Sequence, residues 1–405
     1  MKGSFRKRGC KCPKDKKRCT CGATWSFRID IGIDPVTGKR RQKEGYGYRT
    51  RAEAEDAAAK VYAQILEGSY VAEKNILFKD FAPIWLESYE SSGRVKASTV
   101  EIRRKKLNVL LKCFANVQMK AITTMMYQSV LDDLAKKYAR KTVASVHEVA
   151  SLIFKKAVEM EIIAKDPTRK AQVPFIQKTL EEVEAEEEVP KYLEKDQLQI
   201  FLNAAKNNPQ RYAVFLVLAY TGLRVGELIA LKWKDIDFEE MTIKVTKTLF
   251  NKTGKNTDFT LTLPKTKKSK RTIDVDETVI SELKKLKQWQ KLIKMKYRST
   301  YQDFDFVFVN DKVTYPGYPL QDQTVWAAMK RLLKRSNLPT NLSPHSLRHT
   351  HTSLLAEAGA SLETIMERLG HESDVLTKRV YLHVTKALKK EASQKFSELM
   401  KSLSS

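Results

Sequence analysis

The fold of this chain is decided by three short stretches near its end: HSLRHT at residues 345–350, LGH at 369–371 and VYLHV at 380–384. Five of the six histidines lie in the last 61 of the 405 residues, in or beside these stretches. Histidine exchanges protons near neutral pH, and the planar guanidinium of arginine matches the oxygens of a phosphate. The stretches therefore indicate a site for proton transfer beside a phosphate group.

An earlier stretch, YTGLRVGEL at residues 220–228, adds a further arginine. Gly222 suits the end of a helix, where the chain turns and presents Arg224. Glu227 follows one helical turn later, and two interpretations stay open: it holds Arg224 by a charge-assisted bond, or it is a solvated helix carboxylate. Arg224 and Arg348 together would clamp one phosphate.

The chemistry of such a clamp is narrowed by what the sequence lacks. Attack on a phosphodiester builds negative charge on two non-bridging oxygens, which cations or hydrogen bonds must meet. The motifs offer no convincing carboxylate cluster for Mg²⁺, and the sequence contains no P-loop motif. A covalent route, in which a tyrosine attacks phosphorus and stores the bond energy, is favoured over a two-metal nuclease.

In order and spacing, the stretches resemble the motifs of tyrosine recombinases, which include the integrases of phages and conjugative transposons. The resemblance covers about residues 191–390. It implies a site-specific recombinase that cuts and rejoins DNA through a 3′-phosphotyrosine and so integrates and excises a mobile element. The nucleophile would be Tyr381, ten residues after His371. The catalytic residues that the resemblance implies are Arg224, Lys265, His345, Arg348, His371 and Tyr381.

The resemblance also implies how protons move. His345 would help to deprotonate the nucleophile, and His371 would donate a hydrogen bond to the transition state. The general acid for the departing 5′ oxygen would be a lysine on the β-hairpin LPKTKKSKRTI, residues 263–273. The Pro-Lys-Thr placement favours Lys265, with Lys267 as the alternative. Three further histidines match no catalytic position and are expected to be structural: His349, His351 and His383.

The chain is strongly basic, with 74 Lys and Arg against 48 Asp and Glu and a formal net charge of +26. Such an excess indicates a polyphosphate partner, because binding releases the counterions of a nucleic acid. No apolar run reaches the ~18–20 residues of a membrane span, and the basic N-terminus lacks the apolar centre of a signal peptide. We therefore expect a cytoplasmic, DNA-associated protein with no membrane partner.

Composition and patterning predict a multidomain protein. Near the start, TWSFRIDIGI at residues 24–33 alternates like a half-buried strand, a second strand begins at about residue 39, and a capping box at 50–53 opens a helix. The predicted order is a small α+β domain at 1–75, an all-α bundle at 76–175, an acidic linker at 176–190, a mixed α+β domain at 191–390 and a tail helix at 391–405.

Four of the five cysteines lie within the first 21 residues, so they indicate a small local site. They form two close doublets, Cys10-x-Cys12 and Cys19-x-Cys21. Four thiolates so placed would hold structural Zn²⁺, whereas the flanking lysines would also suit reactive thiols. Both interpretations stay open.

The resemblance assigns a DNA partner to each domain. The α+β domain would bind arm-type DNA sites through basic strands, and the SAM-like helical bundle and the catalytic domain would clamp the double-stranded core site. It further implies a homotetramer on DNA and no cofactor for catalysis. The need for a directionality factor or a host DNA-bending protein stays open, as does packing of the tail helix within one protomer or onto a neighbour. The alternatives are a type IB topoisomerase-like enzyme and a non-catalytic DNA-binding regulator.

Overall fold

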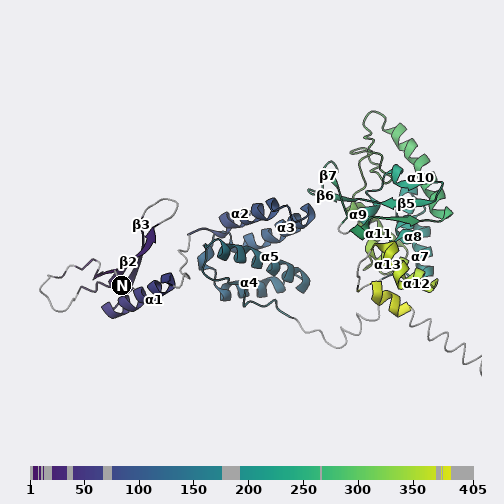
Figure 1. Ribbon diagram of the computed structural model, residues 1–405. Helices are drawn as coiled ribbons and strands as arrows, with labels where there is room; N and C mark the ends of the chain where they lie inside the picture. Colours follow the sequence, from purple (N-terminus) through teal and green to yellow (C-terminus); the bar gives the residue numbers. More distant parts are fainter. Residues whose placement is uncertain are drawn as a thin grey trace, which may run out of the picture. The chain divides into compact units, whose positions relative to one another are not determined.

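The structure, a computed structural model, describes residues 3–7, 9–10, 12, 21–33, 40–66, 75–175, 192–264, 267–370, 375 and 377–384. The chain divides into two compact units, Met1–Ile176 and Gln177–Ser405 (Figure 1). Across the described part of the chain, no helix is long and apolar enough to span a membrane. Some predicted features lie outside the described residues: the linker at 176–190, the tail helix at 391–405, Lys265 and His371.

The first unit begins with a three-stranded antiparallel sheet whose strands are β1 (Gly3–Lys7), β2 (Trp25–Ile33) and β3 (Arg40–Tyr48). Helix α1 (Arg51–Leu66) packs on the sheet and covers Phe27 and Ile29 of the central strand β2. The sequence predicted β2 and β3 but missed β1. The single apolar face predicted for β2 is wrong at its end, where Ile33 is 67% exposed because the pairing with β3 shifts register.

The start of α1 follows the predicted capping box with one difference. Oγ1 of Thr50 accepts a hydrogen bond from the backbone N–H of Glu53 at 3.1 Å, as expected. The carboxylate of Glu53 reaches back one residue further than the motif requires and accepts from the N–H of Arg49 at 2.9 Å. Both bonds satisfy backbone donors near the helix start.

The rest of the first unit is helical, with α2 (Phe78–Ser91), α3 (Ala97–Phe114), α4 (Thr124–Ala135) and α5 (Arg140–Glu159), and a 3₁₀ turn η1 (Met119–Ala121). An apolar stripe of α2, made of Phe78, Phe81 and Trp85, is buried in one core with α3 and α5. Ser98 and Thr99 are typical capping residues, but they do not cap α3, because that helix begins earlier, after Lys96.

The second unit mixes helices with short strands. Two small antiparallel sheets form, one of order β4-β5-β8 and one hairpin of β6 and β7. Their strands are β4 (Ile236–Asp237), β5 (Thr242–Val245), β6 (Thr248–Asn251), β7 (Phe259–Thr262) and β8 (Arg271–Asp274). The sequence alone indicates two long strands at 242–249 and 259–275, but the structure has four short strands there, shared between two sheets.

The helices of this unit surround α8, a buried central helix. Val214, Phe215 and Leu218 are all buried, as expected of a helix that is apolar on every side. The helical elements are α7 (Lys195–Ala205), α8 (Pro209–Thr221), α9 (Val225–Leu228), η2 (Trp233–Asp235), η3 (Lys267–Ser269), α10 (Glu277–Lys296), α11 (Asp322–Arg335), α12 (Pro344–Glu357) and α13 (Leu362–Leu369). Helices α7, α10 and α12 contact α8 directly, so the end of α8 is a fixed point from which the next residues project.

Candidate active site

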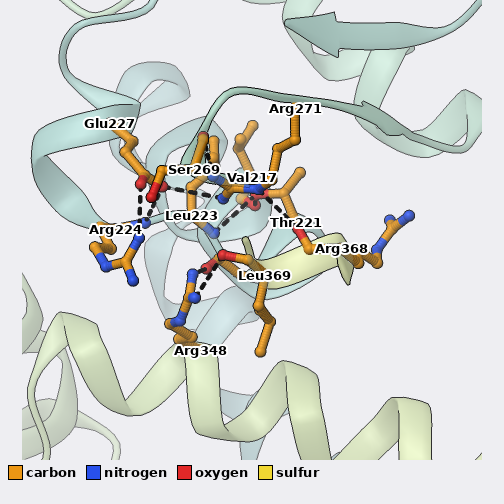
Figure 2. A network of polar contacts seen from close by, with 11 residues as sticks. Val217, Thr221, Leu223, Arg224, Glu227, Ser269, Arg271, Arg348, Arg368 and Leu369 are labelled. Atoms are coloured by element: carbon orange, nitrogen blue, oxygen red, sulfur yellow. Dashed lines mark hydrogen bonds and ion pairs between the residues drawn. The ribbon is translucent and has the colours of Figure 1, made fainter. Parts of the chain in front are cut away.

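Arg348 on α12 is almost completely buried, with 1% of its surface exposed. Its Nη1 donates to the carbonyl oxygen of Gly222 at 2.6 Å, and its Nη2 donates to the carbonyl oxygen of Leu369 at 2.7 Å. These carbonyls lie at the ends of α8 and α13, where acceptors lack intrahelical partners and the helix dipole is negative. One guanidinium thus joins two helix ends (Figure 2).

Both helix ends close on a glycine in the left-handed conformation. Gly222 follows α8 with φ of 62°, and Gly370 follows α13 with φ of 67°. A Cβ on Gly222 would lie only 2.6 Å from Cδ2 of Leu369 and 2.8 Å from Cδ2 of His351. The predicted helix end at Gly222 is confirmed, and the missing side chain also lets three segments approach one another.

Glu227 connects two further arginines. It lies on α9 and is 3% exposed. Its Oε1 accepts from Nη1 of Arg224 at 2.8 Å, and its Oε2 accepts from Nη2 of Arg271 at 3.0 Å. Of the two interpretations of Glu227, the ion pair with Arg224 is confirmed and the solvated carboxylate is wrong. The side chain of Arg224 is 39% exposed, so Glu227 holds a guanidinium that solvent also reaches.

The charge state of Glu227 follows from its neighbours. Burial raises the pKa of the Glu227 carboxyl, but Arg271 and Arg224 lower it by more, and the net pKa lies below its ordinary value. Glu227 is therefore an anion at neutral pH. Arg224, Arg271, Arg348 and Arg368 lie around this carboxylate in the network of Figure 2, so positive charge dominates the network and favours an anionic ligand.

Arg368, directly before Leu369, ties the end of α13 to the neighbouring elements. Its Nη2 donates to the carbonyl of Asp274 at 2.8 Å, and its Nε donates to Nε2 of His351 at 3.2 Å. Its own carbonyl accepts from Nε of Arg271 at 2.8 Å. Arg271 therefore links the Glu227 pair to α13, and the whole network is continuous from α9 to α12.

His351 is a neutral, buried member of this network. It is 5% exposed, and its Nδ1 lies 2.9 Å from the carbonyl oxygen of Ala219. Burial, followed by the charge of Arg368, lowers the pKa of His351 to about 3. Because Nε2 accepts from Arg368, the proton sits on Nδ1 and is donated to Ala219. The expected structural role of His351 agrees with this geometry.

His345 and Arg348 share one face of α12, since residues three apart are neighbours on a helix. His345 lies in the first turn and is exposed. Its ring meets that of His349 edge to face, with 5.1 Å between the centroids. The His-x-x-Arg spacing thus puts an accessible imidazole one turn before the buried guanidinium.

Tyr381 lies in a helical stretch at residues 377–384 and is half-buried. Its ring packs against a small apolar cluster that includes Leu369, the residue whose carbonyl binds Arg348. The other buried members of that cluster are Ala356, Ile365 and Val384. Tyr381 therefore packs against the cluster that includes the end of α13, to which Arg348 also binds.

A groove of ≈ 800 Å³ adjoins the network, between residues 268–274 and α13. Its basic side chains come from Lys268, Lys270, Arg271 and Arg368, and its acidic ones from Asp274, Glu363 and Glu367. The lysine-rich turn predicted to carry the general acid therefore borders the site. Lys265 and His371 themselves lie outside the described residues, and of Lys267 only the backbone, in η3, is described.

Comparison with known proteins identifies the family of this chain. The profile of the phage integrase family matches residues 191–387, and that of an arm DNA-binding domain matches residues 14–65. The integrase of Staphylococcus phage L54a is 30% identical over 344 residues, which cover 81% of this chain and 94% of that protein. The chain belongs to the phage integrase family. It is accordingly a site-specific tyrosine recombinase, an enzyme that transfers DNA strands.

A second relative agrees with this family, and two solved structures share the fold of the chain. The integrase is 30% identical over 322 residues to the prophage ps2 probable integrase of Lactococcus lactis, covering 78% of this chain and 81% of that protein. Its fold matches the Tn1549 transposon integrase, solved with a circular intermediate DNA, at TM-score 0.59 and 22% identity over 77% and 99% of the chains. It also matches a lambda integrase dimer bound to a core site, at TM-score 0.55 and 18% identity over 88% and 92%.

Reasoning from the sequence missed two arginines of this site. Arg271 lies in the quoted hairpin among four lysines, and nothing in the sequence separates it from residues that only contact solvent or phosphate. Arg368 directly precedes the LGH motif and was not singled out. The position of Arg368 directly before Leu369 could have identified it, because a residue beside a motif is positioned by the same helix end.

Proposed function

We propose that this integrase cuts and rejoins DNA through a covalent 3′-phosphotyrosine at Tyr381. The hydroxyl oxygen attacks the phosphorus, the bond to the 5′ oxygen breaks, and that oxygen takes a proton from a general acid. Because the new phosphodiester keeps the bond energy, a 5′ hydroxyl of a second strand can reverse the step without an external energy source. Exchange between two sites would integrate or excise a mobile element.

One observation carries this proposal: both motif arginines are anchored around the end of α8, and Tyr381 packs against the apolar cluster that contains Leu369, whose carbonyl binds Arg348. A guanidinium has five N–H donors in one plane, so it can hold backbone or carboxylate acceptors and a phosphate at once. Arg224 offers its charge from the exposed side. Arg348 is buried below the surface, where its charge is less screened by water.

The proton transfers are assigned to residues by the family resemblance. His345, accessible on the first turn of α12, would assist in removing the proton of Tyr381, and His371 would donate a hydrogen bond to the transition state. Lys265 would protonate the departing oxygen, with Lys267 as the alternative. The side chains named here supply the charge and the protons of the reaction, so we propose that catalysis needs no cofactor.

The binding of DNA is divided among the domains in this proposal. The α+β domain would contact arm-type sites, and the helical bundle and the catalytic unit would hold core-type sites. Arg28 is a basic residue of strand β2, and in this structure it forms an ion pair with Glu44 of β3. On DNA we propose a homotetramer. A lambda integrase tetramer bound to a Holliday junction has the same fold, with TM-score 0.53 and 18% identity. We propose no membrane partner.

A suicide substrate tests the nucleophile. It is a core-type duplex with a nick placed so that the cleaved strand end diffuses away, which traps the covalent adduct. The wild-type chain should give an adduct that resists denaturant, whereas Tyr381→Phe should bind the duplex with unchanged affinity and give none. Tyr297→Phe, a change at the end of α10, serves as the matched control and should react like the wild type. Persistent adducts in Tyr381→Phe would refute the assignment.

A two-site assay separates the recombinase from its alternatives. Two duplexes with attachment sites should yield a Holliday junction and then recombinant products. A topoisomerase-like enzyme would relax supercoiled DNA without either product, and a non-catalytic regulator would form no covalent adduct at all.

A further inference from the structure

Three cysteines of the connection between β1 and β2 come together in space. The Sγ atoms of Cys10, Cys12 and Cys21 all lie within 4.8 Å of one another. The backbone pairing of the two strands ends at Lys7 and Trp25, so these cysteines lie beyond the paired part of the hairpin. They belong to the first unit and lie far in the sequence from the motifs that carry the proposed chemistry at Tyr381.

The spacing of the sulfur atoms fits a metal centre. The Sγ atoms of Cys10 and Cys21 are 3.6 Å apart. The two sulfurs of a disulfide would be about 2.05 Å apart. In a tetrahedral zinc site with Zn–S bonds of about 2.3 Å, neighbouring sulfurs are separated by about 3.8 Å. The observed distance therefore matches one edge of a thiolate tetrahedron.

The described residues of the connection take no part in the small apolar core of this domain. The buried residues of that core are Phe27, Ile29 and Ala58, and none of residues 9, 10, 12 and 21–24 belongs to it. A chain segment that adds nothing to a hydrophobic core is ordered at an entropic cost that a metal can offset. The surroundings are also basic, with eight Lys or Arg and one Asp in residues 6–18. Positive charge there stabilises thiolates, the form that binds metal, and balances a tetrathiolate centre of net charge −2.

We propose that Cys10, Cys12, Cys19 and Cys21 bind one structural Zn²⁺, which closes the connection between β1 and β2. Three of these ligands are brought together in the structure. Cys19 lies outside the described residues and is assigned by its position two residues before Cys21, which mirrors the Cys10-x-Cys12 doublet. The centre is closed by four protein thiolates and is thus structural, because a catalytic zinc keeps one position for water or substrate.

Zinc content of the full-length protein tests the site. The chain is purified with reductant and without chelator, and zinc per chain is measured by inductively coupled plasma mass spectrometry. The wild type should hold one zinc, and Cys10→Ser, Cys12→Ser, Cys19→Ser and Cys21→Ser should each fall to background. The fifth cysteine offers a matched control: Cys113 lies on α3, so Cys113→Ser should keep one zinc. A wild type without zinc, or cysteine variants that retain it, would overturn the proposal.

Cobalt exchange gives a second readout that does not depend on how the variants fold. Wild-type protein loaded with Co²⁺ should show thiolate-to-cobalt charge transfer and the intense d–d bands of a tetrahedral centre. Octahedral, weak bands would contradict the four-thiolate assignment, as would a Cys10–Cys21 disulfide found by peptide mapping of protein kept reduced. Tyr381→Phe should bind zinc like the wild type, so failure of this site and failure of the proposed nucleophile are seen separately.

Discussion

His351 makes the stability of the catalytic unit depend on pH, and replacing it by asparagine should remove that dependence. The folded unit holds the imidazole neutral, since burial and then Arg368 lower the pKa of His351 from 6.5 to about 3. The unfolded chain binds a proton there below about pH 6.5, and the folded unit does not. The neutral His351 thus contributes its full stability above pH 6.5, and this is lost progressively as the pH falls toward 3.

The size of the effect follows from the two pKa values. Between pH 7.5 and pH 5, protonation of the unfolded chain should lower the free energy of unfolding by about 2 kcal/mol, or about 30-fold in the opening equilibrium. At pH 5 this figure barely changes if the folded pKa is one unit higher, because both values lie below the pH. Glu227, anionic in both proteins, contributes equally to each and cancels in the comparison.

Hydrogen exchange measures the effect without assuming that the whole chain unfolds in one step. Opening free energies of amides in α8 and α12 are determined by mass spectrometry at pH 7.5 and pH 5 for the wild type and for His351→Asn. The asparagine side chain keeps a hydrogen-bond donor for the carbonyl of Ala219 and cannot titrate. The variant protein should be less stable than the wild type at both pH values, because the bond to Arg368 is lost. The wild type should lose about 2 kcal/mol more than the variant on acidification. Equal losses in both proteins would refute the neutral, buried histidine.

Three further changes probe the network. Glu227→Gln should cost about 3–5 kcal/mol of unfolding free energy in urea titrations, because it leaves Arg271 buried without its anion. Glu282→Gln on α10, whose partner Lys285 is exposed to solvent, should cost clearly less, and equal costs would contradict this prediction. Gly222→Ala should lower the free energy of unfolding by at least about 1 kcal/mol and remove much of the DNA cleavage rate. The cause is that φ is 62° and that the added methyl group would meet carbon atoms at 2.6 and 2.8 Å. A fully active, equally stable variant would argue against this explanation. Arg348→Lys should lower adduct formation on the suicide substrate without weakening duplex binding. One ammonium group cannot replace a planar guanidinium that donates to two carbonyls. An unchanged adduct yield would count against the proposed phosphate clamp.

Local features beside the predicted site residues were easier to predict from the sequence than the strands. The helix end at Gly222 and the ion pair of Arg224 with Glu227 have local causes and are found in the structure, whereas the catalytic roles stay a prediction. The links between them were not predictable: Arg348 reaches Leu369, and Arg271 reaches Glu227, across 21 and 44 residues of sequence. Such contacts depend on how whole helices pack, which no local pattern encodes.

The N-terminal domain shows the same division. The alternation in β2 is real, but register is set jointly with β3, so the predicted face fails at Ile33. Strand β1 was missed because its five residues, GSFRK, carry a single apolar side chain and no readable period. The cysteine doublets raised the question of a metal, and only the three-dimensional structure brings Cys10 and Cys21 to within 3.6 Å.

The most direct test of the central claim is to identify the amino acid bound to DNA. Adduct trapped on the suicide substrate is digested with nuclease and protease, and the modified peptide is sequenced by tandem mass spectrometry. We expect a nucleotide joined through its 3′ phosphate to the phenolic oxygen of Tyr381, on a peptide from residues 377–384 and their neighbours. A nucleotide on any other residue, or attached through a 5′ phosphate, would contradict it.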